Sequence, residues 1–447
     1  MNRLLSALLS FALAFFLTAC GNTEGSNNLG AAHQVLPGDD PGPPSAKSLL
    51  LIVLESTPER AINSETMPYL AGEFVPKARV WGRHYIPGSW TCTGVGSLVL
   101  GRFPWKIDPD VCHGTDSPYP TSVQLLSDIL GDVGYKTHFL NGNRVAGTLS
   151  GLGEGHFDLV EETASDTHTL MQRAFTIMRE RKGELTYIQV HLMQPHDPHN
   201  LWATSCSATA ASAAGTCEEL TGFDFATDES KNMNSLELSP EAQEVCAEAA
   251  EVTQSCEITS LDETAFPELF TILKPTDKDG EGLGEEWYVA VTTDHGESWG
   301  NLGLDGGPEF NHNQGLQATM THGFFAEWSN EIIPEVVNDV ATNQVDVTPH
   351  LLRELGVSGG GPFDGLPLEE IPLDRVMAGN WYREGNWAVG ATNGDGTRHL
   401  IIDSNGNTGL FDPTVDPTEE RNLYPGEAVP NELRVVTDEV TDATTNY

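Results

Sequence analysis

The chain has 447 residues, of which 39% are hydrophobic, so it holds enough apolar material for a substantial core. It carries 23 Lys and Arg residues against 65 Asp and Glu residues, a formal net charge of −42. This balance argues against nucleic acid and anionic membrane surfaces as partners, because both require basic patches. The length fits either two average domains or one large α/β domain.

The N-terminal segment predicts export. Arg3 precedes an apolar run from Leu4 to Leu17, which is shorter than the roughly 20 residues needed to span a bilayer. Small residues then lead to Cys20, as they do at the cleavage point of a secretory signal. The pattern predicts a signal peptide over residues 1–19, and no later stretch is long and apolar enough to span.

The cysteine at this cleavage point resembles a bacterial lipobox, which implies that Cys20 becomes lipidated and anchors the protein to a membrane. Glycine rather than aspartate follows Cys20, which favours the outer membrane, with the protein on the periplasmic or cell-surface side. An ordinary signal peptide with a chance cysteine is the alternative. Residues 20–46 are rich in Gly, Asn, Ser and Pro and predict a flexible tether.

Three continuous apolar runs predict strands that are buried on both faces, as in a parallel sheet. They are residues 49–54 (LLLIVL), 186–192 (TYIQVHL) and 287–292 (WYVAVT). Helices are expected between them at residues 122–133 and 167–181. Strands that alternate with helices predict an α/β fold with a doubly wound, mostly parallel sheet flanked by helices.

Two further regions depart from this alternation. Residues 200–260 are rich in Ala, Ser, Thr and Glu and carry four of the six cysteines besides Cys20, which predicts a disulfide-rich insertion in a domain spanning residues 47–357. Residues 358–447 are rich in Gly and Pro, with short strand-like runs at 387–391 and 399–403. They predict a C-terminal subdomain with a small antiparallel sheet.

Export permits disulfide bonds. Proximity in the sequence suggests the pairs Cys92–Cys112, Cys206–Cys217 and Cys246–Cys256. Six cysteines nevertheless allow 15 pairings, and sequence alone does not choose among them.

Polar side chains follow each predicted parallel strand, where catalytic groups of such sheets gather. Glu55 follows the first strand, His191 to His196 end the second, and Asp294 with His295 follow the third. Carboxylate and imidazole ligands predict one divalent metal ion, and they suit zinc or manganese better than calcium, which prefers oxygen ligands. A solvated turn capped by Asp294 is the alternative, but it does not explain Glu55 or the later His312.

A Gly-rich and then apolar stretch, residues 88–104, predicts a helix that begins near a hydroxyl or thiol. The N–H groups at such a helix start stabilise an anionic oxygen, and a metal ion at the hydroxyl would make it a nucleophile. An ordinary N-cap Ser or Thr is the alternative.

The chain resembles the alkaline-phosphatase/sulfatase superfamily, with the sulfatase type of N-terminal domain. The resemblance rests on the order of four motifs: LLLIVLES, the Thr-rich loop that ends in GRFP, VHLMQPHDPH and TTDHGES. The late segments VDVTPHLLRELG and GLFDP with DPTEERNL are similar too, so the likeness covers about residues 47–425.

One departure from the sulfatases is important. Thr91 stands where they carry the cysteine or serine that becomes formylglycine, and neither Thr91 nor Cys92 is followed by Cys-x-Pro-x-Arg spacing. Threonine cannot give the aldehyde. Together with Asn141-Gly142-Asn143 and the Asp-His pair, Thr91 makes the site look closer to lipoteichoic-acid synthases and phosphoethanolamine transferases.

The resemblance implies roles for individual residues. The metal ligands would be Glu55, Thr91, Asp294 and His295, with Thr91 also the nucleophile. The other roles are catalysis or oxyanion binding for His196 and His312, and substrate binding for His191, Asn141 and Arg144. His191 could instead point into the core.

The expected function is hydrolysis of phosphate or sulfate esters, or transfer of a phospho group, on a small-molecule, glycan or lipid ester. The alternatives are a sulfuric ester hydrolase proper and a non-catalytic, sulfatase-like binding lipoprotein. Glu55, Thr91, Asp294 and His295 together argue against the binding protein, which needs no nucleophile.

Overall fold

The fold is built around a central sheet of eight strands. The structure is a computed structural model, and it describes residues 47–107, 119, 123–153, 155–163, 167–196, 206–224, 233, 236, 238–274, 282–284, 286–304, 308–312, 315–383 and 386–445. In spatial order the strands are β12 (Glu335–Val337), β2 (Arg79–Trp81), β11 (Phe325–Trp328), β7 (Trp287–Thr293), β1 (Ser48–Leu54), β6 (Thr186–Leu192), β4 (Lys136–Asn141) and β5 (Leu159–Glu162). The five strands from β7 to β5 are parallel, and β11 pairs antiparallel with both β7 and β2.

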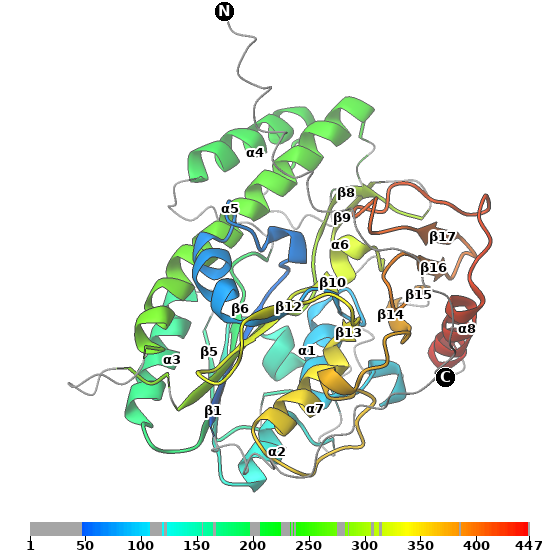
Figure 1. The fold of residues 1–447 in the computed structure, drawn as a ribbon. Coiled ribbons are helices and arrows are strands. Elements are labelled where there is room, and N and C mark those ends of the chain that lie inside the picture. The colour runs from blue at the N-terminus through cyan, green and yellow to red at the C-terminus, as the bar shows by residue number, and fades with distance from the viewer. Residues whose placement is uncertain are drawn as a thin grey trace, which may run out of the picture. The chain divides into compact units, whose positions relative to one another are not determined.

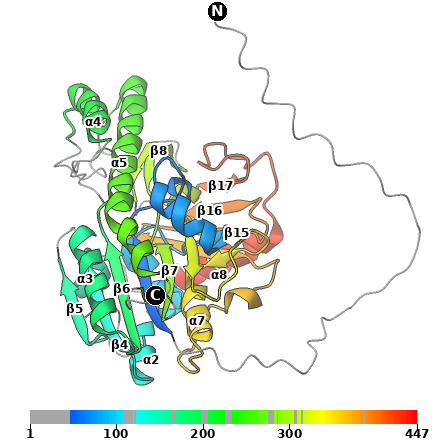
Figure 2. The same ribbon diagram turned by 60° about the vertical axis from the view of Figure 1, so that its left-hand side comes forward.

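Helices cover both faces of this sheet (Figures 1 and 2). Leu50, Ile52 and Leu54 of β1 pack in one core cluster with α3 (Thr167–Glu180) and α5 (Pro240–Ile272). The alternate residues of β1 pack in a second cluster with α1 (Thr91–Leu100), α2 (Leu126–Asp132) and α7 (Gln344–Glu354). Alternate side chains of a strand point to opposite faces, so a strand that is apolar throughout requires two covering layers.

Smaller sheets and short helices surround the central sheet. A four-stranded antiparallel sheet near the C-terminus packs against α8 (Asn431–Thr445). Its strands are β14 (Met377–Arg383), β15 (Asn386–Thr392), β16 (His399–Asp403) and β17 (Thr408–Phe411). The other elements are β3 (His84–Tyr85), β10 (His322–Gly323), β13 (Thr342–Asn343), β8 (Ser298–Leu302), β9 (Pro308–Asn311), α4 (Ser207–Thr221), α6 (Ala318–Thr321), and the 3-10 or π turns η1 (Glu59–Ala61), η2 (Leu70–Phe74), η3 (Val75–Lys77), η4 (Pro104–Lys106), η5 (Val145–Leu149) and η7 (Leu368–Glu370).

The predicted fold class is confirmed: a mostly parallel sheet lies between helices, and a small antiparallel sheet follows it in the chain. Residues 43–447 form one compact unit. The domain boundary placed at residue 357 therefore stays a prediction, as do the signal peptide and tether, which lie outside the described residues. Among the described residues, no helix combines the length and apolar composition needed to cross a bilayer.

The predicted insertion contains two helices, α4 and the first half of α5, and its disulfide prediction was wrong. The bonds are Cys206–Cys256 and Cys217–Cys246. Cys206, at the N-cap of α4, bonds to Cys256 of α5, and Cys217 of α4 bonds to Cys246 of α5. Each bond therefore joins the two helices, whereas the predicted pairs would have joined cysteines of the same helix. Cys92 is disulfide-bonded, and its predicted partner Cys112 lies outside the described residues.

Candidate active site

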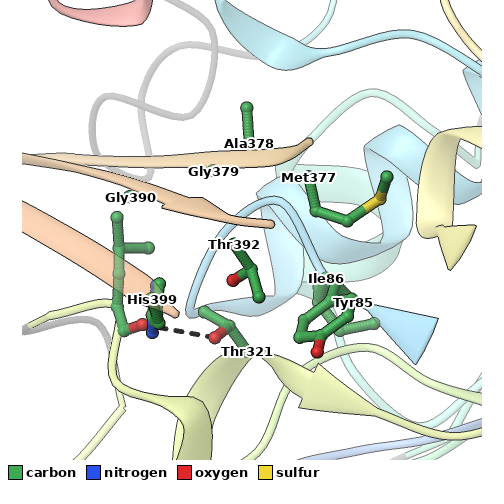
Figure 3. Close-up of a pocket in the computed structure, with 10 residues that line it drawn as sticks. Tyr85, Ile86, Thr321, Met377, Ala378, Gly379, Gly390, Thr392 and His399 are labelled. Atoms are coloured by element: carbon green, nitrogen blue, oxygen red, sulfur yellow. Dashed lines mark hydrogen bonds between the residues drawn. The ribbon is translucent and has the colours of Figure 1, made fainter. Parts of the chain in front are cut away.

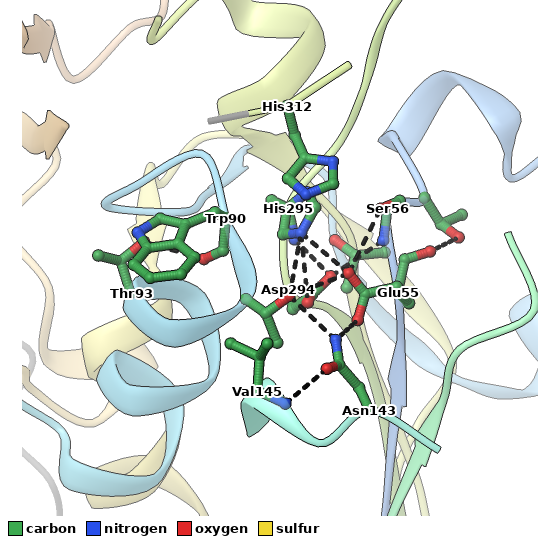
Figure 4. Close-up of polar contacts among 12 residues, drawn as sticks. Glu55, Ser56, Trp90, Thr93, Asn143, Val145, Asp294, His295 and His312 are labelled. Carbon is green, nitrogen blue, oxygen red and sulfur yellow. Dashed lines mark hydrogen bonds and ion pairs between the residues drawn. The ribbon is translucent and has the colours of Figure 1, made fainter. Parts of the chain in front are cut away.

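The carboxyl ends of the parallel strands bring together three predicted metal ligands, Glu55, Asp294 and His295 (Figure 4), and also His191, which was predicted to bind substrate. Glu55 directly follows β1, His191 lies near the end of β6, and Asp294 and His295 directly follow β7. Because β1 lies between β6 and β7, these four side chains meet at one edge of the sheet. All four are fully buried.

Thr91 reaches the same point as the first residue of α1. The first N–H groups of a helix lack partners within the helix, so this position favours an anionic oxygen. A Cβ atom added to Gly94, one turn into the helix, would lie only 2.0 Å from the backbone oxygen of Asp294. Glycine is therefore what allows α1 to pack directly against the end of β7.

The Thr91 hydroxyl lies among polar groups. Its Oγ1 donates to Glu55 Oε1 at 3.0 Å and lies 3.5 Å from His295 Nε2. Asn143 Nδ2 lies 3.2 Å from the same Oγ1 and donates to Glu55 Oε2 at 2.6 Å. The Thr91 oxygen is thereby positioned by groups from three separate loops.

The donor set fits a divalent cation. One oxygen each of Glu55 and Asp294 and one nitrogen of His191 lie within 4.8 Å of one another. Asp294 uses Oδ1 to accept the backbone N–H groups of Ser56 (3.1 Å) and His295 (2.8 Å), while its buried Oδ2 has no hydrogen-bond partner among the described residues. A buried carboxylate oxygen without a donor is costly unless a cation compensates it.

Burial and mutual interactions set the pKa values of this cluster in the metal-free state. Burial works to raise the pKa of Glu55, but hydrogen bonds with His191 and His295 hold it well below its usual range. Burial and the neighbouring Glu55 carboxylate raise the pKa of Asp294 to about 6. Burial works to lower the pKa of His295, yet the charges of Asp294 and Glu55 raise it to about 10.

Metal affinity is expected to increase with pH. With its pKa at about 10, His295 carries a proton at neutral pH that a metal ion must displace. One released proton gives a rise in apparent affinity of about tenfold per pH unit. A chelator-competition titration with Mn²⁺ at pH 6.5, 7.5 and 8.5 measures this slope. His295→Gln, which has no such proton, should bind more weakly and show a shallow slope, and a flat wild-type profile would contradict the assignment of His295 as a ligand.

The same shift has a consequence for the metal-free fold. The folded-state pKa of His295 lies above the ordinary value of 6.5. The protonated ring therefore stabilises the metal-free protein fully below pH 6.5, and this contribution is lost as the pH rises through about 10.

The two other predicted catalytic histidines lie beside this cluster. The ring of His312 lies 4.4 Å from that of His295 and 5.0 Å from that of His196, between centroids. His312 Nδ1 contacts Glu297 Oε2 at 3.0 Å, which fixes the orientation of the ring. Both histidines are half-buried, so they can meet a ligand that enters from solvent.

The predicted substrate-binding residues lie in three different places. His191 Nε2 is 2.8 Å from Glu55 Oε2 and 3.6 Å from Asp294 Oδ2, within the proposed metal cluster. Asn141 is buried and its amide donates to the backbone oxygen of Asn143 at 2.6 Å, so it shapes the loop. Arg144 is exposed to solvent, and among the described residues it makes no hydrogen bond or ion pair with the cluster.

Sequence reasoning missed three residues of the site. Asn143 donates to both Glu55 and Thr91, whereas the sequence pattern pointed to Asn141 of the same motif. Ser56 adopts a left-handed φ of +49° and donates its N–H to Asp294. Gln254 of α5 donates to the Ser56 carbonyl at 2.8 Å, and nothing in the sequence indicated this contact.

A small cavity between the C-terminal sheet and the strands β3 and β10 is not a substrate site (Figure 3). It is lined by Tyr85, Met377 and His399 among others, and its volume is about 20 Å³. A single water needs roughly 10–15 Å³, so the cavity has no room for an ester substrate.

No protein-family model matches the chain, and no curated protein matches it. Solved structures do match. A phosphonate monoester hydrolase from Silicibacter pomeroyi has a TM-score of 0.66 at 14% identity, covering 90% of this chain and 95% of the other. A 2-O GAG sulfatase has a TM-score of 0.63 at 13% identity, covering 90% and 94%.

A third structure is the lipoteichoic acid synthase LtaP from Listeria monocytogenes, with a TM-score of 0.58 at 15% identity, covering 90% of this chain and 91% of the other. Each of these matches covers 90% of this chain. The chain therefore has the fold of the alkaline-phosphatase and sulfatase superfamily.

Proposed function

We propose that this chain is a metal-dependent hydrolase of phosphate or sulfate esters in which Thr91 is the nucleophile. The observation that carries the proposal is the position of the Thr91 hydroxyl, 3.0 Å from Glu55 and 3.5 Å from His295 at the start of α1. A protein that only binds a ligand has no need to bury a hydroxyl among ionisable groups at a helix start.

The proposed ligands of the metal ion are Glu55, Thr91, Asp294 and His295, with His191 beside them. Carboxylate and imidazole donors favour zinc or manganese over calcium. When bound, such an ion would lower the pKa of the Thr91 hydroxyl and neutralise charge on the ester oxygens.

The chain's own residues supply positioning and proton transfer. Asn143 and Glu55 hold the Thr91 oxygen, which forms a bond to phosphorus or sulfur as the bond to the leaving oxygen breaks. The first-turn N–H groups of α1 favour the charge on the transferred group. His312, whose ring is oriented by the contact between Nδ1 and Glu297, is the residue proposed to give a proton to the leaving oxygen. Water, or an acceptor hydroxyl, would then release the group from Thr91.

A substrate panel tests this proposal and names the ester class. The purified full chain would be assayed with one aryl group as phosphate monoester, phosphodiester and sulfate ester, with Zn²⁺, Mn²⁺, Ca²⁺ or EDTA. We expect turnover of at least one ester with Zn²⁺ or Mn²⁺ and none with EDTA. Asp294→Asn is the matched inactive control, since it keeps the hydrogen bonds to Oδ1 and loses one ligand charge.

Two outcomes would redirect the assignment. Turnover of the sulfate ester alone would make the chain a sulfuric ester hydrolase that works without formylglycine. Absence of turnover on every ester, together with no bound metal, would overturn the catalytic proposal and leave a binding protein.

A further inference from the structure

A second group of metal-type ligands lies on α7, away from the site described above. It consists of His350, Glu354 one helical turn later, and Glu369 of η7. Residues four apart on a helix lie on one face, so His350 and Glu354 point to the same side. One ligand atom from each of the three residues lies within 4.8 Å of the others.

The strongest evidence for a cation site here is the orientation of the buried His350 ring. The ring is fully buried, and its Nε2 contacts Glu327 Oε2 at 2.6 Å. The other nitrogen, Nδ1, is buried, makes no hydrogen bond within the described residues, and lies 3.3 Å from Glu369 Oε2. A histidine whose second nitrogen binds a carboxylate while the first faces other ligands is the usual arrangement around a protein-bound metal ion.

Glu327 is itself firmly held, so the His350 ring cannot easily rotate. Its carboxylate accepts hydrogen bonds from the Tyr288 hydroxyl and the Trp81 indole, and Glu327 is fully buried. A carboxylate that holds a metal-binding histidine in this way typically contributes about 10- to 100-fold to metal affinity.

The local charges leave room for a divalent cation. Arg79 and Arg353 both contact Glu369, so an ion-pair network without metal is the alternative. Carboxylates outnumber these two guanidinium groups, since Glu327, Glu335, Glu354, Glu369 and Glu370 all lie in contact with one or other of them. A dication would therefore enter a region with excess negative charge.

We propose that His350, Glu354 and Glu369 bind a second divalent cation, of the zinc or manganese class, that ties α7 to the segment around η7. Glu327 pairs with Ala290 in the sheet, four residues before Asp294 on β7. At about 3.3 Å per residue this places the second site about 13 Å from the active-site cluster along the strand. The ion would stabilise the fold and would not take part in the reaction.

Metal stoichiometry tests this site. The full chain would be dialysed to equilibrium against buffered Zn²⁺, and bound metal would be counted per chain by mass spectrometry. We expect two ions for wild type, one for Glu354→Gln, and one for Asp294→Asn. Glu370→Gln is the matched control, because Glu370 also contacts Arg353 but is not one of the three ligands, and it should keep two ions.

Stability of the variant can be checked independently. Glu354 is the last residue of α7, where a negative charge opposes the helix dipole, so Glu354→Gln should fold normally in EDTA. Zn²⁺ should raise the Tm of Asp294→Asn, which keeps only the second site, and should not raise that of the double variant with Glu354→Gln.

Either of two results would overturn the second site: equal stoichiometry in Glu354→Gln and wild type, or no bound ion in Asp294→Asn. If Glu354→Gln failed to fold, Asp294→Asn alone would decide, because it should still bind one ion. The test is separate from the proposed function, since loss of the active-site ion would appear as a fall of one ion in wild type while Asp294→Asn kept its own.

Discussion

Thr91→Ala is expected to lower kcat/KM for the hydrolysed ester by about three to six orders of magnitude, as loss of a nucleophile does in enzymes that form covalent intermediates. The substitution removes the Thr91 hydroxyl and its γ-methyl group, while Glu55, His295 and Asn143 remain in place. Steady-state kinetics with the best ester of the panel measures the change. The fold and metal content of the Thr91→Ala variant should stay close to wild type, because Thr91 contributes one ligand among several.

Two control variants, Thr91→Ser and Thr93→Ala, test whether the effect depends on the hydroxyl of Thr91. Thr91→Ser keeps a hydroxyl at the same position and should retain much of the activity. Thr93→Ala removes a hydroxyl from the same helix turn, which only donates to the Trp90 carbonyl at 2.9 Å, and should leave the rate within a few fold of wild type. If Thr91→Ala kept more than a tenth of the wild-type rate, Thr91 would not be the nucleophile.

Gly94→Ala is expected to destabilise the protein although alanine normally favours a helix. The new Cβ would lie 2.0 Å from the Asp294 carbonyl oxygen, so α1 and the end of β7 must move apart. Overpacking of this kind costs about 1–3 kcal/mol in the free energy of unfolding. The movement also separates Thr91 from Asp294 and His295, and a misplacement of about 1 Å can cost about 100-fold in rate. Denaturant unfolding and ester kinetics on the same sample measure both effects.

Gly215→Ala is the matched control for this substitution. Gly215 also lies inside a helix, α4, but an added Cβ there meets nothing within 4 Å. Alanine should then raise the free energy of unfolding by up to about 1 kcal/mol and leave the rate unchanged. Equal effects at the two glycines would contradict the close packing of α1 against β7.

The strands that could be predicted are those buried on both faces. Residues 49–54, 186–192 and 287–292 read as continuous apolar runs, and each is a parallel strand within one residue of these limits. The short strands β2, β12 and β13 were missed because two or three residues carry no periodic pattern. The long helix α5 was missed because its Ala, Ser, Thr and Glu residues form no apolar stripe over the insertion.

The residues of the candidate site could be predicted where they directly follow a strand. Glu55, Asp294 and His295 follow strands directly, so sheet geometry brings them together without knowledge of the loops. Asn143 depended on a loop detail: the Asn141 amide binds the backbone of residue 143 and so turns the Asn143 side chain toward Glu55. Contacts of this kind depend on the direction of side chains within a loop, which the spacing of residues in the sequence does not determine.

The continuity of α5 has a mechanical consequence. The helix runs for 33 residues, about 50 Å at 1.5 Å per residue, from the disulfide-bonded insertion into the core beneath the sheet. Gln254, part-way along the helix, donates a hydrogen bond to the carbonyl of Ser56, the residue that follows Glu55. Pro267 interrupts the hydrogen bonding of α5 in its last two turns, but the helix is continuous from the disulfide-bonded Cys246 to Gln254. A displacement of the helical hairpin is therefore expected to be transmitted through Gln254 to the loop that carries Ser56 and Glu55.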